Sequence, residues 1–263
     1  MTPTLAGVFG FPVAHSRSPA IHNAAYAALD LDWLYLRLPI SELRFEATAR
    51  ALGGSGFRGA NVTIPHKLAA LALADSASAA AAAVGAANTL SYADDGSIEA
   101  DNTDAGGLLA AIGELPPGTT ALVLGAGGAG RAAAWALREA GAEVSIWNRN
   151  AERAKELADE FEIGHAEVPA PVELLVNATA VGLNSGNDDG SSALEALGLV
   201  GVEPPAVAVD LPYAVDETRF IAWARSGGAR VVDGFEVLVH QGALSFERWT
   251  GREAPLDAMR AAR

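Results

Sequence analysis

The stretch that most constrains this chain lies at residues 120–150, where a glycine-rich motif separates two apolar runs. The first run, Ala-Leu-Val-Leu, is typical of a short buried parallel strand. The motif Gly-Ala-Gly-Gly-Ala-Gly follows at 125–130, and an alanine-rich segment then predicts a helix over 131–140. Gly141 is placed to end that helix, and residues 143–147 are the next expected strand. Strand, glycine turn, helix and strand within about 30 residues predict a dinucleotide-binding unit.

The glycines of this motif have separate physical purposes. Gly125 allows a tight turn, Gly127 lets the backbone approach a pyrophosphate, and Gly130 lets the helix pack closely on the strand. The helix N-terminus offers unpaired N–H groups and the positive end of the helix dipole to phosphate oxygens. The expected cofactor-binding residues of the turn are Gly125, Ala126, Gly127, Gly128, Ala129 and Gly130. The alternative is a glycine-rich turn that binds no ligand.

The end of the second strand indicates which dinucleotide would bind. A site for NAD usually places an aspartate or glutamate there, which accepts a hydrogen bond from the ribose 2′-hydroxyl. This chain has Asn148, Arg149 and Asn150 instead, followed by Arg153. A guanidinium can bind a 2′-phosphate through two hydrogen bonds, whereas a carboxylate would repel it. These residues therefore predict NADP. The alternative is that both arginines belong to a solvated first helical turn.

The charge balance restricts the partners. With 32 acidic and 18 basic residues the formal charge is −14, which opposes binding to nucleic acid or to an anionic membrane. No apolar run is long enough to span a membrane, and the N-terminus lacks the basic segment of a secretory signal. Cysteine is absent, which excludes disulfides and thiolate metal sites. We therefore expect a cytoplasmic protein with no membrane or nucleic-acid partner.

Strands and helices are expected to alternate along the chain. Before the glycine motif, the pattern predicts strands at 5–9, 33–38, 59–63, 88–92 and 97–100, and helices at 18–29, after Ser41, after Pro65, at 76–83 and at 102–112. Beyond residue 150, it predicts helices at 151–161, 235–249 and from 255, strands at 174–177, 206–209 and 229–232, and a polar loop at 184–192. Such alternation predicts a predominantly parallel α/β fold, and the central position of the glycine motif predicts a second domain before it.

Four polar clusters fall at or just after expected strand ends, where ligands bind in open α/β sheets. They are residues 15–19 (His-Ser-Arg-Ser-Pro), 61–67 (Asn-Val-Thr-Ile-Pro-His-Lys), 88–89 (Asn-Thr) and 101–104 (Asp-Asn-Thr-Asp). Their hydroxyls, amides and one Lys/Asp pair suit a small polyhydroxylated substrate. The histidines and carboxylates show no zinc-ligand spacing, so no metal is expected. The serines lack a nucleophile elbow, which argues against acyl transfer.

Lys67 is one of only two lysines, because the other basic residues are arginines. Lysine can give and take a proton, which arginine does not do, and this makes Lys67 a candidate for proton transfer. Structural alternatives remain for each polar residue. Ser16 and Ser18 could cap a helix, and Asp104 could be a carboxylate at a helix start. Lys67 could be a surface residue of a first helical turn, although the helix dipole disfavours a cation there.

Taken together, these stretches resemble the shikimate dehydrogenase family. The resemblance rests on residues 10–19, 61–67, 85–89 and 102–104, the glycine turn, Asn148-Arg149, 177–179 with Gly182, 210–213, and 234–243 with Gln241. It runs in order over nearly the whole chain. It implies an α/β fold of two domains with a cleft between them. The substrate domain would comprise residues 1–102 plus 238–263, and the Rossmann NADP domain residues 103–237.

The resemblance also implies a reaction, the reversible NADPH-dependent reduction of 3-dehydroshikimate to shikimate in aromatic amino acid biosynthesis. Lys67 and Asp104 would form the catalytic pair. The implied substrate-binding residues are Ser16, Ser18, Thr63, Lys67, Asn88, Asp104, Tyr213 and Gln241, and Thr179 and Gly234 join the cofactor-binding residues.

Two positions depart from the family pattern. Asn150 stands where threonine is common beside the 2′-phosphate, and Val237 where methionine is common. The function and the oligomeric state stay open at this point. The alternatives in function are a broader quinate/shikimate dehydrogenase and a non-catalytic NADP-binding sensor, and the protein could be a monomer or a homodimer.

Overall fold

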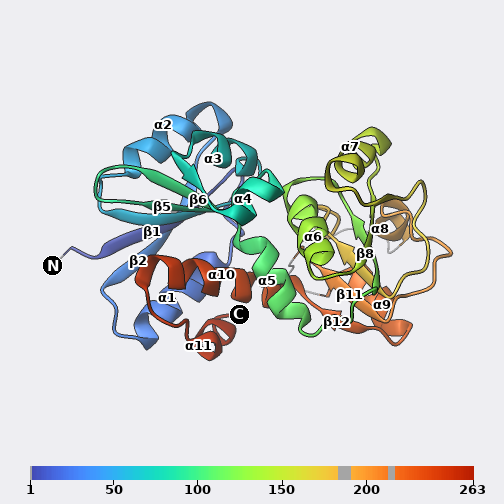
Figure 1. Cartoon of the computed structure of the whole chain (residues 1–263). Helices are drawn as coiled ribbons and strands as arrows, with labels where there is room; N and C mark the ends of the chain where they lie inside the picture. The colour runs from blue at the N-terminus through green and yellow to red at the C-terminus, as the bar shows by residue number, and fades with distance from the viewer. Residues whose placement is uncertain (1, 183–190, 213–216) are drawn as a thin grey trace. The chain divides into compact units, whose positions relative to one another are not determined.

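The computed structural model describes residues 2–182, 191–212 and 217–263. The chain divides into two compact units. Figure 1 shows the helices and strands of both. Unit 1 comprises Met1–Gly107 and Leu238–Arg263, and unit 2 comprises Leu108–Val237. The first division lies between Gly107 and Leu108, inside helix α5 (Thr103–Ile112).

Unit 1 is built on a mixed sheet. Its described part contains six strands in the order β2-β1-β3-β5-β6-β4. They are β1 (Thr4–Gly10), β2 (Trp33–Pro39), β3 (Phe57–Val62), β4 (Ser76–Ala77), β5 (Thr89–Tyr92) and β6 (Ile98–Asp101). Strand β1 pairs in parallel with β2 and β3, whereas β5 pairs antiparallel with both β3 and β6. Strand β4 pairs in parallel with β6. The expected parallel character therefore holds for three of the five pairings described in this sheet.

Helices cover both faces of this sheet (Figure 1). They are α1 (Ser18–Ala28), α2 (Glu42–Leu52), α3 (Lys67–Leu73), α4 (Ala79–Val84) and α10 (Gly234–Thr250), and α11 (Leu256–Ala261) packs against α1. Helix α10 packs directly on the sheet, since a Cβ atom at Gly59 of β3 would overlap the indole of Trp249. The indole Nε1 of Trp249 donates to the Leu90 carbonyl at 3.1 Å. A glycine in β3 therefore permits the close approach that joins the C-terminal helix to this unit.

Unit 2 has a sheet of different topology. Its described strands, all parallel, lie in the order β12-β11-β10-β7-β8-β9. They are β7 (Thr120–Leu124), β8 (Glu143–Trp147), β9 (Gly164–His165), β10 (Leu174–Asn177), β11 (Val207–Asp210) and β12 (Arg230–Val232). The chain runs outward from β7 to β9 and then returns to β10 on the other side of β7. This is the doubly wound order of dinucleotide-binding sheets, with the switch point between β7 and β10.

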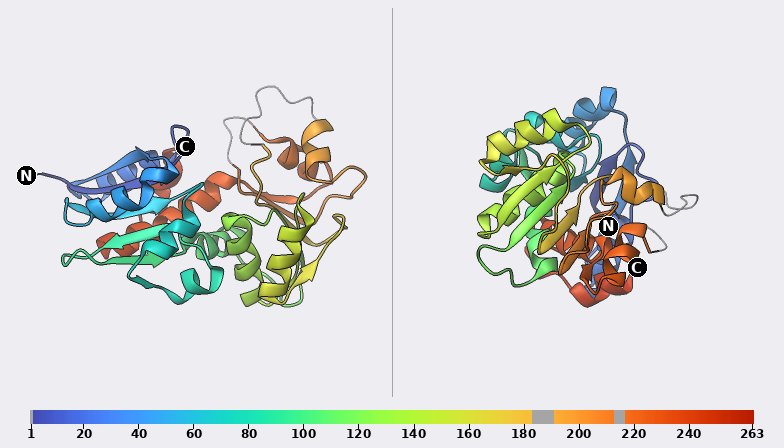
Figure 2. Two further views of the ribbon diagram at one scale, coloured as in Figure 1. Left: turned by 90° about the horizontal axis from the view of Figure 1, so that it is seen from above. Right: turned by 90° about the vertical axis from the view of Figure 1, so that its right-hand side faces the viewer.

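The helices of unit 2 lie on both faces of its sheet (Figures 1 and 2). They are α6 (Gly128–Glu139), α7 (Ala151–Phe161), α8 (Ser191–Ala196) and α9 (Arg219–Ser226). Leu137 of α6 and Leu157 of α7 belong to one buried apolar cluster, and Phe220 of α9 belongs to another. The strands between these clusters are apolar on both sides, as expected for a buried parallel sheet.

Most expected elements are present, and the short ones differ. The helix expected at 76–83 is divided: Ser76 and Ala77 form β4, and α4 begins at Ala79. The hydroxyl of Ser78 caps α4, because it accepts the N–H of Ala81 at 3.1 Å. The two-residue strand β9 and the helix α8 were not expected. Most of the expected loop at 184–192 lies outside the described residues.

No helix among the described residues is long and apolar enough to cross a membrane.

Candidate active site and cofactor site

The topology of unit 1 brings the four polar clusters to one edge of its sheet. Strands β1 and β3 are parallel, so residues 15–19 and 61–67 lie at or beyond the same ends. Strand β5 runs in the opposite direction, so its first residue, Thr89, lies at that edge as well. Strand β6 reverses direction again and ends there at Asp101. Residues far apart in the sequence therefore face the same end of the sheet.

Lys67 and Asp104 form an ion pair at this edge. Lys67 is the first residue of α3, and Asp104 is the second residue of α5. The Nζ atom of Lys67 lies 2.5 Å from Oδ2 of Asp104. The two side chains are 14% and 22% exposed, respectively. The pair is therefore largely shielded from solvent while remaining accessible to a small molecule.

Asn88 connects Asp104 to helix α10. Its Nδ2 atom lies 2.7 Å from Oδ1 of Asp104, 3.0 Å from Oγ1 of Thr103 and 3.1 Å from Oε1 of Gln241. Its Oδ1 atom accepts the N–H of Thr103 at 2.7 Å. Lys67, Asn88, Asp104 and Gln241, all predicted site residues, are thus joined in one hydrogen-bonded group.

A second layer of polar residues lies behind this group. The hydroxyl of Tyr35 donates to Oδ1 of Asn61 at 2.7 Å, and Nδ2 of Asn61 donates to Oγ1 of Thr89 at 3.1 Å. The hydroxyl of Thr89 in turn donates to Oδ1 of Asn88 at 3.0 Å. Asn61 and Thr89 stand within the polar clusters, but sequence reasoning gave them no role. Tyr35 was missed because nothing in an alternating apolar strand indicates its partner.

The predicted hydroxyl residues follow β1 and β3: Ser18 begins α1, Ser16 lies just before it, and Thr63 comes directly after β3. Ser16 and Ser18 are buried, and their hydroxyls are 3.2 Å apart. The guanidinium of Arg37 donates to the Ser16 carbonyl at 2.7 and 3.2 Å, which fixes this turn. Ser18 is not the helix cap, because the cap position of α1 is Arg17. Thr63 follows β3 and is partly buried, and its N–H donates to the Phe9 carbonyl at 2.9 Å.

The glycine turn of unit 2 has the geometry expected of a pyrophosphate site. Gly125 has φ +107°, a conformation that side chains rarely adopt. A Cβ atom at Gly130 would overlap the Gly125 carbonyl, which shows how closely α6 approaches β7. A Cβ atom at Gly127 would meet no atom within 4 Å. The space above Gly127 and the N-terminus of α6 therefore fit a phosphate group.

The end of β8 fits a 2′-phosphate. Oδ1 of Asn148 accepts the N–H of Ala126 at 3.3 Å, which fixes the strand end beside the glycine turn. Asn150 caps α7, because its side chain accepts the N–H of Arg153 at 3.3 Å. Arg149 and Arg153 are exposed. Both arginines are thus open to solvent at the start of α7, and Asn150 has a structural role as the cap of this helix.

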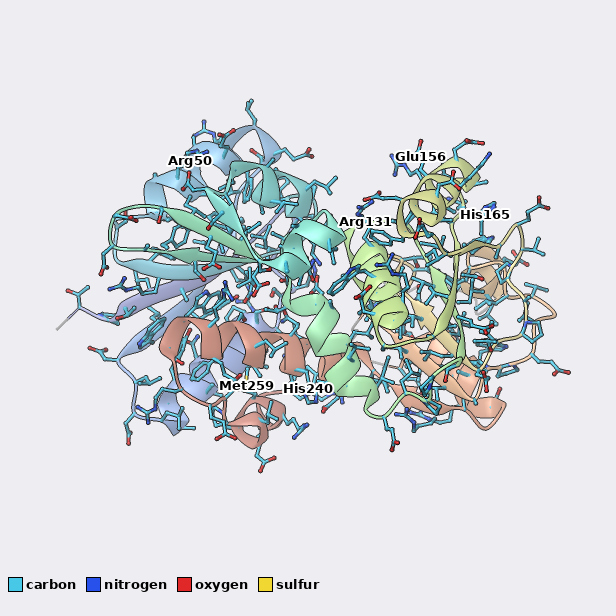
Figure 3. The ribbon with its side chains drawn as sticks, viewed as in Figure 1. Arg50, Arg131, Glu156, His165, His240 and Met259 are labelled. Carbon is cyan, nitrogen blue, oxygen red and sulfur yellow. The ribbon has the colours of Figure 1, made fainter. Side chains whose placement is uncertain are left out.

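One further arginine stands beside the glycine turn. Arg131, labelled in Figure 3, lies in the first turn of α6. Its guanidinium binds both carboxylate oxygens of Glu160 on α7, and it lies 5.1 Å from the ring centre of Phe161. These contacts tie α6 to α7, which is a structural use of this cation.

The remaining predicted residues are on the other side of the switch point. The N–H and hydroxyl of Thr179 donate to Oδ1 of Asn177, at 3.1 and 2.7 Å. Gly234 is the first residue of α10, where a Cβ atom would lie 2.5 Å from the Leu211 carbonyl. Tyr213 lies outside the described residues.

Two buried groups have strongly shifted pKa values. Burial raises the pKa of Asp210 to about 7, an effect that nearby Asp233 adds to and that the Thr218 and Asn177 donors oppose. Burial lowers the pKa of His22 to about 3, so this imidazole is neutral at physiological pH. His22 stacks on Tyr35 with ring centres 4.2 Å apart, behind the polar layer of unit 1.

No group of three or more histidines and carboxylates among the described residues could hold a metal ion.

A doubly wound unit with an NADP-type glycine turn, together with a unit that carries a Lys–Asp pair, defines a class of protein, the dinucleotide-dependent oxidoreductases. Family models match along the chain. Residues 8–90 match the shikimate dehydrogenase substrate binding domain, and residues 112–180 match shikimate / quinate 5-dehydrogenase. Residues 234–262 match the shikimate 5′-dehydrogenase C-terminal domain.

Relatives match over almost the full length. Shikimate dehydrogenase (NADP+) of Acidiphilium cryptum is 43% identical over 96% of this chain and 92% of its own. The enzyme of the same name from Carboxydothermus hydrogenoformans is 38% identical over 98% and 95%. A crystal structure of shikimate 5-dehydrogenase from Thermus thermophilus in complex with NADP(H) and shikimate is 41% identical, with a TM-score of 0.88 over 98% and 97% of the two chains. The chain belongs to the shikimate dehydrogenase family.

Proposed function

We propose that this protein catalyses the reversible NADPH-dependent reduction of 3-dehydroshikimate to shikimate. The observation that carries the proposal is the ion pair of Lys67 with Asp104, surrounded by Asn88 and Gln241. These four residues lie in unit 1. Two of them, Lys67 and Asn88, lie within the stretch that matches the family model for the substrate binding domain. NADPH supplies the hydride when it is bound to unit 2.

Lys67 is the proton donor of the reduction. A lysine side chain is an ammonium at neutral pH, and the Asp104 carboxylate 2.5 Å away stabilises that charge. In the reduction, the ammonium gives a proton to the ketone oxygen and stabilises the negative charge that develops there. In the oxidation of shikimate, Lys67 must first lose its proton.

Hydroxyl and amide groups orient the substrate. Ser16, Ser18 and Thr63 offer hydroxyl donors suited to the ring carboxylate. Asn88, Asp104 and Gln241 offer both donors and acceptors suited to ring hydroxyls, and Tyr213 is the remaining proposed contact. Ser16, Ser18, Asn88 and Gln241 are buried. Their burial favours a ligand that pairs with them, because an analogue without the matching hydroxyl leaves polar atoms unpaired.

The cofactor residues favour NADP over NAD. The strand end at 148–150 carries no carboxylate, and Arg149 and Arg153 are exposed cations at the start of α7. The turn Gly125, Ala126, Gly127, Gly128, Ala129 and Gly130 binds the pyrophosphate, and Asn148, Asn150, Thr179 and Gly234 complete the set. A local positive site of this kind holds an anionic cofactor in spite of the formal charge of −14.

The test is an assay of NADPH formation by absorbance, with shikimate and quinate each supplied with NADP+ and with NAD+. Turnover with shikimate and NADP+ is expected, with little turnover for the other three combinations. Comparable turnover with quinate would favour a broader enzyme, in line with the model named shikimate / quinate 5-dehydrogenase that matches residues 112–180. NADPH binding without turnover on any of these would support a sensor.

The expectations about location and assembly are part of this proposal. A chain without cysteine and without a membrane-spanning helix among its described residues fits a cytoplasmic enzyme. We infer that it acts there as a monomer or a homodimer. Size-exclusion chromatography with light scattering distinguishes the two.

A further inference from the structure

A buried carboxylate joins the two loops that leave β10 and β11. Asp210 is the last residue of β11 and is 0% exposed. It lies opposite Asn177, the last residue of β10, in the parallel register of the two strands. Both residues therefore stand at the carboxyl edge of the sheet, where ligands of doubly wound folds bind. Neither residue belongs to the glycine turn.

Each oxygen of this carboxylate accepts from a different loop. Oδ1 of Asp210 accepts from Nδ2 of Asn177 at 2.7 Å, and Oδ2 accepts from the hydroxyl of Thr218. The same Asn177 amide also donates to the Val181 carbonyl at 3.2 Å, and its oxygen accepts the N–H of Thr179. Asp210 thus fixes the amide that shapes residues 178–182. Its hydrogen bond to Thr218 fixes the residue that caps α9.

These loops contact each other and the glycine turn. A Cβ atom at Gly182 would lie 3.3 Å from Cγ2 of Thr218, so the two loops approach closely. A Cβ atom at Gly125 would lie 3.0 Å from the Ala178 carbonyl and 3.2 Å from Cγ2 of Thr179. A shift of residues 178–182 would therefore change the surface beside the pyrophosphate site.

We propose that Asp210 is a positioning residue for the cofactor, whose carboxylate holds residues 178–182 and Thr218 in the arrangement that receives the nicotinamide end of NADP. In a doubly wound sheet, the first half binds the adenine nucleotide and the second half, which contains β10 and β11, binds the nicotinamide nucleotide. A buried carboxylate is costly unless both oxygens accept hydrogen bonds, and both do. This inference rests on the proposed NADP-dependent function.

The variant Asp210→Asn separates this role from others. Asparagine has one acceptor oxygen and no charge. Its NH2 group therefore either faces the Asn177 amide, which is also a donor, or reverses the hydrogen bond with the Thr218 hydroxyl, and in both cases the charge-assisted contacts are lost. We expect the dissociation constant for NADPH at about pH 8 to rise roughly ten- to hundredfold, the range for losing a hydrogen bond to a charged group. The dissociation constant for shikimate without cofactor should stay unchanged, since its proposed ligands among the described residues lie in unit 1.

A matched control makes the same chemical change at the opposite edge of the same sheet. The carboxylate of Glu173 accepts from the N–H and the hydroxyl of Thr120, at 2.8 and 3.0 Å. Glu173→Gln should therefore bind NADPH as the natural protein does. If Asp210→Asn fails to fold, Thr218→Val and Thr218→Ser take its place. Valine removes the hydroxyl and should weaken NADPH binding, whereas serine keeps the hydroxyl and should restore it.

The outcomes distinguish the inference from the function on which it rests. If the natural protein binds NADPH while Asp210→Asn and Thr218→Val bind it equally tightly, Asp210 does not position the cofactor site, whatever happens to the melting temperature. If the natural protein does not bind NADPH at all, the proposed function fails, and this inference fails with it.

Discussion

Nδ2 of Asn88 lies 3.1 Å from Oε1 of Gln241, although 153 residues separate them in the sequence. The same nitrogen also lies within hydrogen-bond distance of Asp104 and Thr103. An NH2 group has two hydrogens, so three acceptors compete for them. One acceptor can therefore turn to a ligand without leaving Asn88 unpaired. Helix α10 thus completes a site that begins at the other end of the chain.

Gln241→Ala tests this arrangement. We expect the KM for shikimate to rise about tenfold, the effect of one or two lost hydrogen bonds, with a smaller change in kcat. The KM for NADP+ should not change, since Gln241 lies in unit 1. Steady-state kinetics with each substrate varied in turn measure both constants. A fall in kcat with an unchanged KM for shikimate would contradict the prediction, because it would place Gln241 in the chemical step alone.

Lys67→Ala should lower turnover by about two to four orders of magnitude, the range for general acid–base catalysis. NADPH binding, measured by fluorescence titration, should remain as in the natural protein. Lys67→Arg is the second variant to measure, because arginine keeps a cation beside Asp104 but stays protonated and so does not act as an acid. A loss nearly as large in Lys67→Arg indicates proton transfer. A loss below tenfold in Lys67→Ala would show that another group is the acid.

Two glycines of one turn should respond differently to alanine. A Cβ atom at Gly130 would overlap the Gly125 carbonyl, so Gly130→Ala should lower the melting temperature. A Cβ atom at Gly127 meets no protein atom within 4 Å, so Gly127→Ala should fold normally. It should nevertheless bind NADPH at least tenfold more weakly, since the methyl group would occupy the space of the phosphate. Thermal unfolding and NADPH titration of both variants provide the test. Normal NADPH affinity in Gly127→Ala would argue against pyrophosphate binding at this turn.

Arg149→Ala should reduce the preference for NADP over NAD. The loss of a charge-assisted contact to the 2′-phosphate should raise the KM for NADP+ about tenfold or more and leave the KM for NAD+ unchanged. Arg44→Ala, which removes an exposed arginine from α2 in unit 1, is the matched control. The ratio of kcat/KM for the two cofactors is the measured quantity. An equal change for both cofactors would mean that Arg149 does not contact the 2′-phosphate.

The pKa of His22 predicts acid sensitivity. The folded imidazole has a pKa of about 3, whereas the unfolded one takes a proton near pH 6.5. Between these values the unfolded state binds more protons, so stability falls as pH decreases. At about pH 5 the loss is on the order of 2 kcal/mol. His22→Phe keeps an aromatic ring against Tyr35 and removes this dependence. A melting temperature that falls as steeply with acid in His22→Phe would contradict the prediction.

Asp210 should act in the opposite direction over part of the same range. Its folded pKa of about 7 exceeds the unfolded value of 3.8, so the folded state holds the additional proton between them. Stability from this group therefore falls as pH increases from about 4 to about 7. The stability of Asp210→Asn should fall more steeply with decreasing pH than that of the natural protein. The variant keeps the loss of stability caused by His22 but lacks the gain that Asp210 contributes. Melting curves measured across this pH range for the two single variants reveal both slopes. An unchanged profile in Asp210→Asn would contradict the assignment.

Local features of the chain were predictable because short-range physics determines them. The strand, glycine turn, helix and strand at 120–150 occur as expected, since buried strands and close-packed glycines leave a pattern within a few residues. The two-residue strands β4 and β9 were not predictable, because two residues contain no periodicity. The direction of β5 relative to β3 was equally hidden, since an apolar strand has the same pattern in either direction.

The sequence by itself determined the α/β class, the NADP-type turn and the four polar clusters, because each follows from composition or from residues close together in the chain. Gln241, Tyr213, Thr179 and Gly234 were candidates through the family resemblance alone. Only the tertiary structure decided which of them meet. Lys67 meets Asp104, Asn88 meets Gln241, and Asp210 meets Asn177 through strand order and register. Such contacts depend on the packing of distant segments. That packing is the sum of many weak interactions, and no single residue along the chain specifies it.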